Sequence, residues 1–389
     1  MKETLLKNVE IILPNESIQK GSILIRDEKI ADISSDDKNF QADEVFDLEG
    51  QKLYAGFIDI HIHGSVGIDV NAASVEDLHK VSKFLASKGI TAWLPTLVPD
   101  SDENYQKIVN SIDELMEIQI DKPIAQALGV HYEGVFANEK MCGALRPQFF
   151  KTFKNSDEVV QLPKLNAPNA VHLMTLAPEI ENGIELIKEL KKQNWIVSLG
   201  HTKADSVTLE KAKRAGAKHL THFFNAMTGL HHRDLGVVGW GLTDKEISFD
   251  IIADGVHVHP KMLEFGCRSK TPAGTILISD AVAPTGLGDG DFEMWNEKIS
   301  VVDGKTRNER GNIAGSVITM LDAVKMMFSL GFSETEVSQM ASANPARLLQ
   351  IEKTHGSIEI GKRADLIALD ENGNAKLCFV GGKVCFKDI

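Results

Sequence analysis

The stretch that decides the fold is Phe57-Ile58-Asp59-Ile60-His61-Ile62-His63-Gly64. Successive side chains of an extended strand point to opposite faces, so the three isoleucines share one face. Asp59, His61 and His63 share the other, and two histidines spaced in this way can bind one metal ion through their ring nitrogens. A half-buried strand with solvent-exposed histidines would show the same alternation. The wholly aliphatic opposite face favours a strand that carries part of a metal site.

The chain from residue 54 to residue 350 alternates short apolar runs with helical patterns, which is typical of βα units. Eight parallel strands alternating with helices predict a (β/α)8 TIM-like barrel, in which the chemistry sits at the carboxyl ends of the strands. The strand candidates are 57–63, 92–97, 125–133, 171–176, 196–201, 219–222, 247–252 and 275–280. Helical patterns include 75–88, 184–193, 206–215 and 317–329.

Both ends of the chain read as short strands separated by turn-like pairs such as Pro14-Asn15 and Gly381-Gly382. Residues 1–53 and 351–389 are therefore predicted to form one small β-sandwich beside the barrel. Its strand candidates are 5–13, 21–33, 45–53, 356–360, 364–369, 375–380 and 383–386. The glycine-rich run 286–291 lacks the GK[ST] of a phosphate-binding loop and is predicted to be a surface loop.

Composition excludes several classes of protein. The 389 residues carry a formal net charge of -13, which argues against nucleic-acid or anionic-membrane partners. The four cysteines are scattered without metal-binding spacing and read as reduced thiols. The amino-terminal residues are too often charged for a signal peptide, and no apolar run is long enough to span a bilayer. We expect a cytoplasmic protein.

Histidines and carboxylates end five of the predicted strands, and the carboxyl ends of barrel strands meet at one rim. Imidazole and carboxylate are ligands of Zn²⁺ and Fe²⁺, and a bound ion with an open position lowers the pKa of water toward neutrality. This coincidence predicts a metallohydrolase site. The residues concerned are His61, His63, Glu133, His201, His222 and Asp280.

Asp280, at the end of the eighth strand, is assigned a separate role. A carboxylate at this place could take a proton from the attacking water and give it to a leaving amine. It could also touch the metal, or simply cap the following loop.

A second group of residues has the chemistry of anion recognition. Arg233 can bind a phosphate with two hydrogen bonds, and His257 can add a further donor. Asn225 and the backbone of Ala226 could hydrogen-bond polar substituents of a substrate. Each residue alone is weak evidence, because arginines and histidines on loops are commonly solvated.

Together these motifs resemble the N-acetylglucosamine-6-phosphate deacetylase family of the amidohydrolase superfamily, over nearly the whole chain. The Asn-Ala-Met and Asp-Gly-x-His elements are the most particular to it. The motifs that carry the resemblance are Ala55-Gly56-Phe57-Ile58-Asp59, His131-x-Glu133-Gly134, Thr175-Leu176-Ala177-Pro178-Glu179, Gly200-His201-Thr202, Thr221-His222-x-x-Asn225-Ala226-Met227, Asp254-Gly255-x-His257, Ser279-Asp280-Ala281, Ala314-Gly315-Ser316 and Asn344-Pro345-Ala346.

The resemblance implies release of acetate from an amino-sugar phosphate by a homodimer, with substrate contacts that cross between subunits. It implies one or two divalent ions per subunit; the ligand chemistry favours Zn²⁺ and leaves Fe²⁺ as an alternative. Glu133, His201 and His222 would hold the principal ion, and His61 and His63 decide whether a second one binds. The remaining implied roles are Asp280 as catalytic acid and base, and Asn225, Ala226, Arg233 and His257 as binders of the sugar phosphate.

The sequence departs from the family pattern at two places. Glu133-Gly134 is followed by Val135 where the family has proline, and Leu145 stands where the family has a histidine that contacts the substrate near the amide carbonyl. Losing such a donor could cost ~10²-fold in rate unless a neighbour such as Arg146 replaces it. Two alternatives therefore stay open: another N-acyl substrate, such as N-acetylgalactosamine-6-phosphate or an unphosphorylated compound, or a non-catalytic sugar-phosphate-binding homologue.

Overall fold

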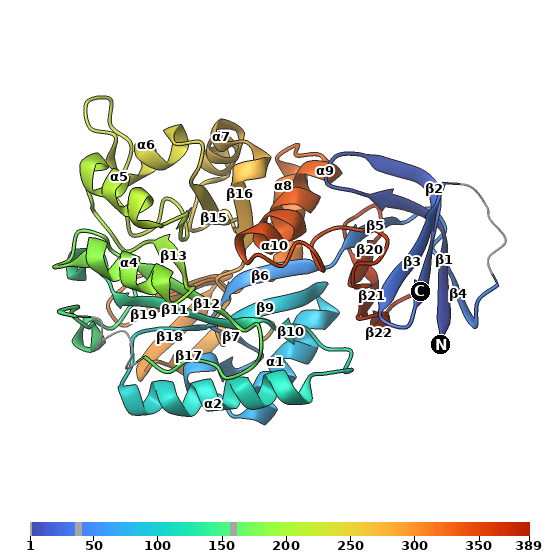
Figure 1. Ribbon diagram of the computed structural model, residues 1–389, viewed down its shortest axis with the longest axis horizontal. Coiled ribbons are helices and arrows are strands. Elements are labelled where there is room, and N and C mark those ends of the chain that lie inside the picture. The colour runs from blue at the N-terminus through green and yellow to red at the C-terminus, as the bar shows by residue number, and fades with distance from the viewer. Residues whose placement is uncertain (1, 36–40, 156–161) are drawn as a thin grey trace.

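The computed structural model describes residues 2–35, 41–155 and 162–389, and its largest part is a nearly closed barrel of eight parallel strands (Figure 1). Neighbouring strands pair in chain order, and a bridge between Ile62 and Ala281 joins the last strand to the first. All eight predicted strands are confirmed. They are β6 (Phe57–Ile62), β9 (Ile90–Leu97), β11 (Gly129–Phe136), β12 (Val171–Leu176), β13 (Ile196–Leu199), β14 (His219–Leu220), β15 (Ser248–Ile252) and β16 (Thr275–Ile278).

Helices follow the barrel strands where the apolar spacing predicts them. In the first of them, Leu78, Val81 and Leu85 lie on one face and are buried, and Ser74 caps the amino end. The predicted helix at 317–329 begins later, because Thr319 and Asp322 form its capping box. The principal helices are α1 (Val75–Ser87), α2 (Asp102–Ile118), α4 (Gly183–Lys192), α5 (Ser206–Ala215), α6 (Gly236–Thr243), α7 (Pro260–Lys270) and α8 (Met320–Ser329).

The two ends of the chain build one module, as predicted. Figure 1 shows the blue amino-terminal strands beside the red carboxyl-terminal ones at one end of the molecule. They form a single mixed sheet in which Tyr54 pairs with Ile367. The predicted strand at 356–360 is wrong, since this segment consists of turns and bends. The strands are β1 (Glu3–Ile12), β2 (Ser17–Arg26), β3 (Lys29–Ser34), β4 (Glu44–Asp47), β5 (Lys52–Ala55), β20 (Leu366–Leu369), β21 (Ala375–Val380) and β22 (Lys383–Lys387).

A small antiparallel sheet follows the last barrel strand and was not predicted. It consists of β17 (Gly290–Met294), β18 (Glu297–Val302) and β19 (Lys305–Asn308). The run 286–291, predicted to be a loop, therefore already includes the first residues of β17. The tight turn at Trp295-Asn296 joins β17 to β18, and Trp295 is 8% exposed.

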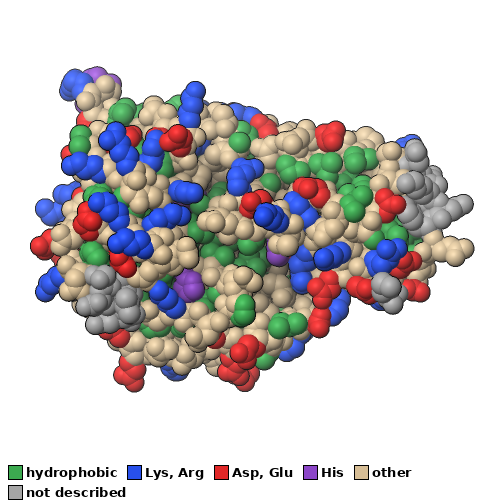
Figure 2. Space-filling view, in the orientation of Figure 1, with side chains coloured by type: hydrophobic (Ala, Val, Ile, Leu, Met, Phe, Trp, Pro, Cys, Tyr) green, Lys and Arg blue, Asp and Glu red, His purple; other side chains and the backbone are tan. Residues whose placement is uncertain are grey.

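Charged side chains of both signs are interspersed over the face shown in Figure 2, and few histidines reach it. All four cysteines are free thiols, as expected from their spacing. Among the helices of the described residues, none has both the length and the apolar character needed to cross a membrane.

Candidate active site

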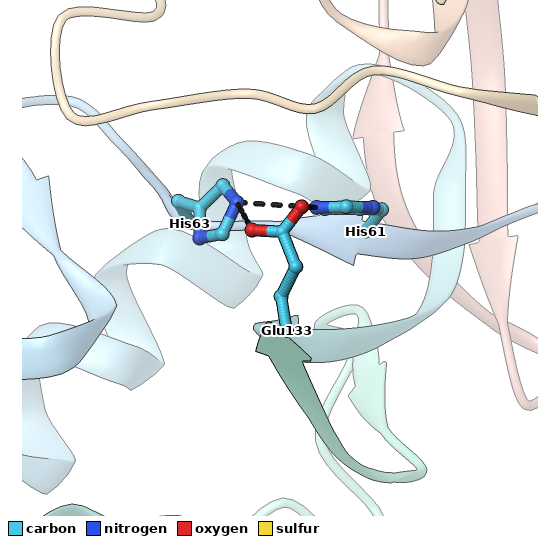
Figure 3. Close-up of side chains that lie close together, drawn as sticks. All are labelled: His61, His63 and Glu133. Carbon is cyan, nitrogen blue, oxygen red and sulfur yellow. Dashed lines mark hydrogen bonds and ion pairs between the residues drawn. The ribbon is translucent and has the colours of Figure 1, made fainter. Parts of the chain in front are cut away.

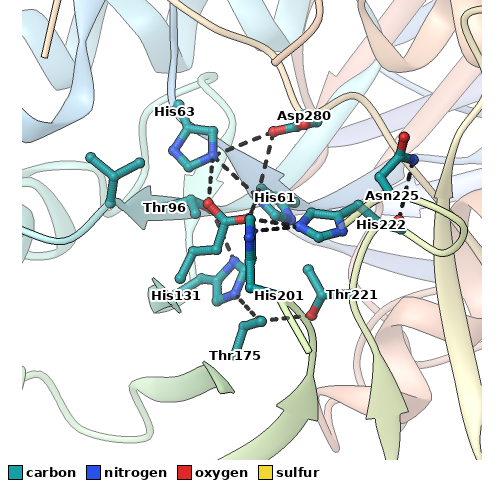
Figure 4. Close-up of polar contacts among 12 residues, drawn as sticks. His61, His63, Thr96, His131, Thr175, His201, Thr221, His222, Asn225 and Asp280 are labelled. Atoms are coloured by element: carbon teal, nitrogen blue, oxygen red, sulfur yellow. Dashed lines mark hydrogen bonds and ion pairs between the residues drawn. The ribbon is translucent and has the colours of Figure 1, made fainter. Parts of the chain in front are cut away.

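The predicted metal ligands meet around the carboxylate of Glu133 at the carboxyl end of the barrel. Its Oε1 lies 3.1 Å from His222 Nε2, 3.2 Å from His201 Nε2 and 3.3 Å from His61 Nε2. Its Oε2 lies 3.3 Å from His63 Nε2. Figure 3 shows Glu133 of β11 reaching toward His61 and His63, and Figure 4 adds His201 and His222, which follow β13 and β14.

These five side chains form two groups that could each hold a metal ion. One group is His61, His63 and Glu133, and the other is Glu133, His201 and His222. Within each group the ligand atoms lie within 4.8 Å of one another, and every member is buried. Because Glu133 belongs to both groups, the arrangement can accommodate two ions bridged by one carboxylate.

The surroundings of these ligands fit a bound cation. The Nδ1 of His201 donates to the carbonyl of Met141 at 2.7 Å, which leaves its Nε2 free to act as a ligand. Although burial lowers the pKa of a histidine, Asp280 and Glu133 together raise the pKa of His63 to about 10. The site therefore attracts positive charge, which a divalent ion held by neutral imidazoles would supply.

Asp280 approaches the same centre from the end of the eighth strand. Its Oδ1 lies 3.3 Å from His63 Nε2 and 3.5 Å from His61 Nε2 (Figure 4). Burial raises the pKa of a carboxyl group, but the charges of His61 and His63 prevail, so the pKa of Asp280 is lowered. Burial also raises the pKa of Glu133, but the charge of His61 and the hydrogen bonds of His201 and His222 outweigh it. The pKa of Glu133 therefore lies well below its usual range. Both groups are carboxylates near neutral pH.

Sharp backbone turns at the strand ends aim these side chains inward. His201, His222 and Asp280 have φ values of 48°, 36° and 51°, and Ala226 has 51°. Non-glycine residues seldom adopt this left-handed region, which costs on the order of 1–3 kcal/mol each. The coincidence at four residues of one site indicates that the fold holds them there against a local preference.

A chain of buried hydrogen bonds lies beneath the ligands and was not predicted. His131 Nε2 lies 2.8 Å from Thr175 Oγ1, which lies 2.7 Å from Thr221 Oγ1 (Figure 4). Thr96 Oγ1 donates to the carbonyl of Leu94, so it accepts from Nδ1 of His131 at 3.3 Å. Burial and the charge of His61 hold the pKa of His131 well below its ordinary value, so the ring is neutral. Its edge packs on His61 with ring centroids 4.7 Å apart.

Asp59 links the first and last strands of the barrel behind the site. Its Oδ2 accepts from Ser279 Oγ at 2.6 Å and from Ser279 N at 3.2 Å, and its Oδ1 accepts from His61 N at 3.2 Å. Burial raises the pKa of Asp59 to about 7. The alternation along β6 predicts that Asp59 lies on the polar face, but its partner on the eighth strand could not be read from the sequence.

A pocket of about 260 Å³ opens over the ligands. Asn225, Ala226 and His257, which were predicted to bind substrate, line it together with Asp280 and all the proposed ligands except His61. His257 Nδ1 donates to Asp254 Oδ2 at 2.7 Å. Burial lowers the pKa of His257, but the hydrogen bond and charge of Asp254 outweigh it, so the pKa is raised. This end of the pocket therefore suits an anion.

Arg233 is not brought to this pocket. It lies in an exposed loop, where its Nη1 contacts His232 Nε2 at 2.7 Å, and it does not line the cavity. Arg146 does not take the place of the missing histidine either, because its Nη2 donates to Pro99 O at 2.8 Å and pairs with Asp100 at 2.7 Å. The residue at the wall is Leu145 itself, which is 3% exposed.

Comparison with known proteins places the chain in a family. Residues 53–385 match the Amidohydrolase family. The N-acetylglucosamine-6-phosphate deacetylase of Bacillus subtilis (strain 168) is 34% identical over 395 residues, which cover 99% of this chain and 98% of that protein. The N-acetylgalactosamine-6-phosphate deacetylase of Escherichia coli O157:H7 is 35% identical over 343 residues, which cover 87% of this chain and 89% of that protein.

Solved structures agree with this assignment. A mutant N-acetyl-D-glucosamine-6-phosphate deacetylase from Mycobacterium smegmatis, in complex with N-acetyl-D-glucosamine-6-phosphate, has a TM-score of 0.91 to this chain. The two are 25% identical, and the match covers 100% of each chain. The chain therefore belongs to the amidohydrolase family and, within that superfamily, to the N-acetylglucosamine-6-phosphate deacetylase family of metal-dependent amide hydrolases.

Proposed function

We propose that the protein removes the acetyl group from an N-acetylated amino-sugar 6-phosphate, with N-acetylglucosamine-6-phosphate as the leading substrate. One observation carries this proposal: a single pocket holds the carboxylate-bridged histidine cluster, Asp280 and an anion-binding end around His257. An amide carbonyl at the cluster and a phosphate at His257 would occupy its two ends. The names of the relatives support the same substrate class.

Glu133, His201 and His222 would hold the principal ion, and His61, His63 and Glu133 would hold a second one. Buried imidazole and carboxylate ligands suit Zn²⁺ first and Fe²⁺ second. When bound, such an ion polarises the amide carbonyl and makes water acidic enough to react at neutral pH.

Asp280 is proposed to move the proton of the reaction. As a carboxylate it takes a proton from the attacking water, and it returns the proton to the nitrogen of the sugar as the C–N bond breaks. The products are acetate and the free amino-sugar phosphate. An aspartate is ionised at neutral pH, so Asp280 can accept the proton in the first step.

The sugar phosphate is proposed to bind at the opposite end of the pocket. Asp254 holds the Nδ1 of His257, so the other ring nitrogen remains for the phosphate. Asn225 and Ala226 line the same pocket, and the Asn225 side chain and the Ala226 backbone are proposed to meet sugar hydroxyl groups there.

Arg233 is proposed to act across a homodimer interface. In its own subunit it lies outside the pocket on an exposed loop that also presents Leu230 and Leu235, which are 54% and 42% exposed. Mixing an Arg233→Ala protein with an Asp280→Asn protein tests this idea. If the mixed heterodimers are active while both single-variant proteins are inactive, Arg233 reaches the partner's pocket. If the mixture is as inactive as the two variants alone, the proposed contact is contradicted.

N-acetylgalactosamine-6-phosphate is the second candidate substrate. The N-acetylgalactosamine-6-phosphate deacetylase is 35% identical to this chain, about as similar as the N-acetylglucosamine-6-phosphate deacetylases. Leu145 also alters the pocket wall near the expected position of the carbonyl group. The decisive measurement is acetate release from the two epimeric sugar phosphates and from their unphosphorylated forms, by purified protein with measured metal content. Turnover of neither phosphate by zinc-loaded protein would overturn the proposed function.

A further inference from the structure

Trp295 separates the active-site pocket from a second, larger cavity. The second cavity has a volume of about 620 Å³ and is lined by polar groups that include Asp69, Asp100 and Arg146. Among the residues that the structure describes, Trp295 is the one that lines both spaces. Its ring lies edge-on to His63, with centroids 5.3 Å apart.

The backbone that presents this side chain is unusual. Trp295 and Asn296 form the two-residue turn between β17 and β18, with φ values of 57° and 60°. Such a turn prefers glycine, asparagine or aspartate, and a bulky aromatic residue at its first position is disfavoured. A tryptophan at a place that suits glycine indicates that the side chain has a use there that offsets the backbone strain.

The indole belongs to the apolar side of the active-site pocket. Trp295 and Leu145 are members of one cluster of packed buried side chains, together with Val282 and Ala314. The ionisable side chains that line the pocket are His63, Glu133, His201, His222, His257 and Asp280, and none of them belongs to this apolar cluster. A substrate whose carbonyl sits beside His63 would direct the apolar end of its acyl group toward this wall of aromatic and aliphatic carbon atoms. The buried Nε1 of Trp295 has no hydrogen-bond partner among the described residues.

We propose that the indole of Trp295, backed by Leu145, closes the acyl end of the pocket and restricts the enzyme to short acyl groups such as acetyl. A longer acyl chain would have to pass through the position of the indole to reach the space beyond it. This inference rests on the proposed amide hydrolysis and adds a residue that determines acyl-chain specificity.

The test compares N-acetyl and N-butanoyl derivatives of the same amino-sugar phosphate. Trp295→Gly removes the indole and places glycine where φ is already 57°, so the turn itself is not strained by the change. Because each methylene in such a pocket changes discrimination by roughly 10–200-fold, we expect the acetyl-to-butanoyl ratio of kcat/KM to fall at least about tenfold in the variant. Trp295→Leu, which keeps apolar bulk in the cluster, should give a smaller change in the same direction.

Val302→Ala is the matched control, since Val302 lies on the same small sheet and is 62% exposed. It should leave the ratio unchanged. A ratio within about twofold of wild type in both Trp295 variants, with acetate still released and native-like melting, would overturn the inference. So would a variant that changes discrimination between the hexose epimers while the acyl ratio stays constant. Failure of the wild type to release acetate would instead count against the proposed function.

Discussion

Thr175→Val tests whether the buried chain of hydroxyl groups beneath the ligands contributes to stability. The change keeps the shape of the side chain and removes its hydroxyl group. The direction of every bond in the chain follows from Thr96, whose proton goes to the carbonyl of Leu94. His131 Nδ1 therefore donates to Thr96, and its Nε2 accepts from Thr175, which accepts from Thr221.

The magnitude follows from the groups left without partners. Without the Thr175 hydroxyl, the Nε2 of His131 has no donor among the residues that the structure describes, and the hydroxyl of Thr221 loses its acceptor. A buried polar group without a partner costs about 1–3 kcal/mol. Thr221 still has Ser198 Oγ at 2.5 Å, which reduces its share. We therefore expect the free energy of unfolding to fall by about 2–4 kcal/mol.

The assay is urea unfolding of metal-free and zinc-loaded protein, followed by circular dichroism. Thr175→Ser is the matched partner, because it keeps the hydroxyl and loses one methyl group, at a cost of about 1 kcal/mol. Thr152→Val makes the same threonine-to-valine substitution at an exposed position, so it is the control for effects unrelated to burial. The reasoning is refuted if the Thr175→Val protein is as stable as wild type. It is also refuted if the Thr175→Ser protein is less stable than the Thr175→Val protein.

Three further predictions concern the metal, the wall and the phosphate. His63→Ala should lower the zinc content measured by mass spectrometry from two ions per subunit to one, because only one group keeps three ligands. Leu145→His should raise kcat for the preferred acetylated substrate, by up to ~10²-fold, if a donor is missing at this wall. The raised pKa of His257 means that its proton, and so its attraction for phosphate, is lost only as pH rises through that pKa. Asp254→Asn should therefore move the alkaline fall of kcat/KM to lower pH for the phosphorylated substrate and not for the unphosphorylated one.

The barrel and the metal ligands are predictable because they depend on local patterns. Strand β6 alternates aliphatic and polar residues, and its histidines therefore share a face whatever the rest of the chain does. The carboxyl ends of all eight strands meet at one rim, so the sequence alone is enough to bring Glu133, Asp280 and the four histidines His61, His63, His201 and His222 together there. The convergence of their nitrogens on Glu133 matches that expectation.

The remaining parts of the site depend on contacts between distant loops, which no local pattern encodes. Trp295 lies in a turn whose glycine-rich approach predicts a loop, and nothing near it in sequence indicates that it packs on His63. Arg146 was a reasonable substitute for the missing histidine by position, but its neighbour Asp100 holds it in the adjoining cavity. Arg233 lies on an exposed loop outside the pocket of its own chain, and no local pattern in the sequence indicates that position.

The sheet shared by the two ends of the chain has a consequence for synthesis. Strand β5 pairs with β20, and Ala55 meets Leu366, about 300 residues later. At translation rates of about 5–20 residues per second, the amino-terminal strands wait on the order of 15–60 s for this partner. During that interval β5 presents an open hydrogen-bonding edge, and the apolar residues that Leu366, Leu377 and Phe379 will cover remain accessible to chaperones or to other nascent chains. The last residues to be synthesised thus complete the sheet begun by the first.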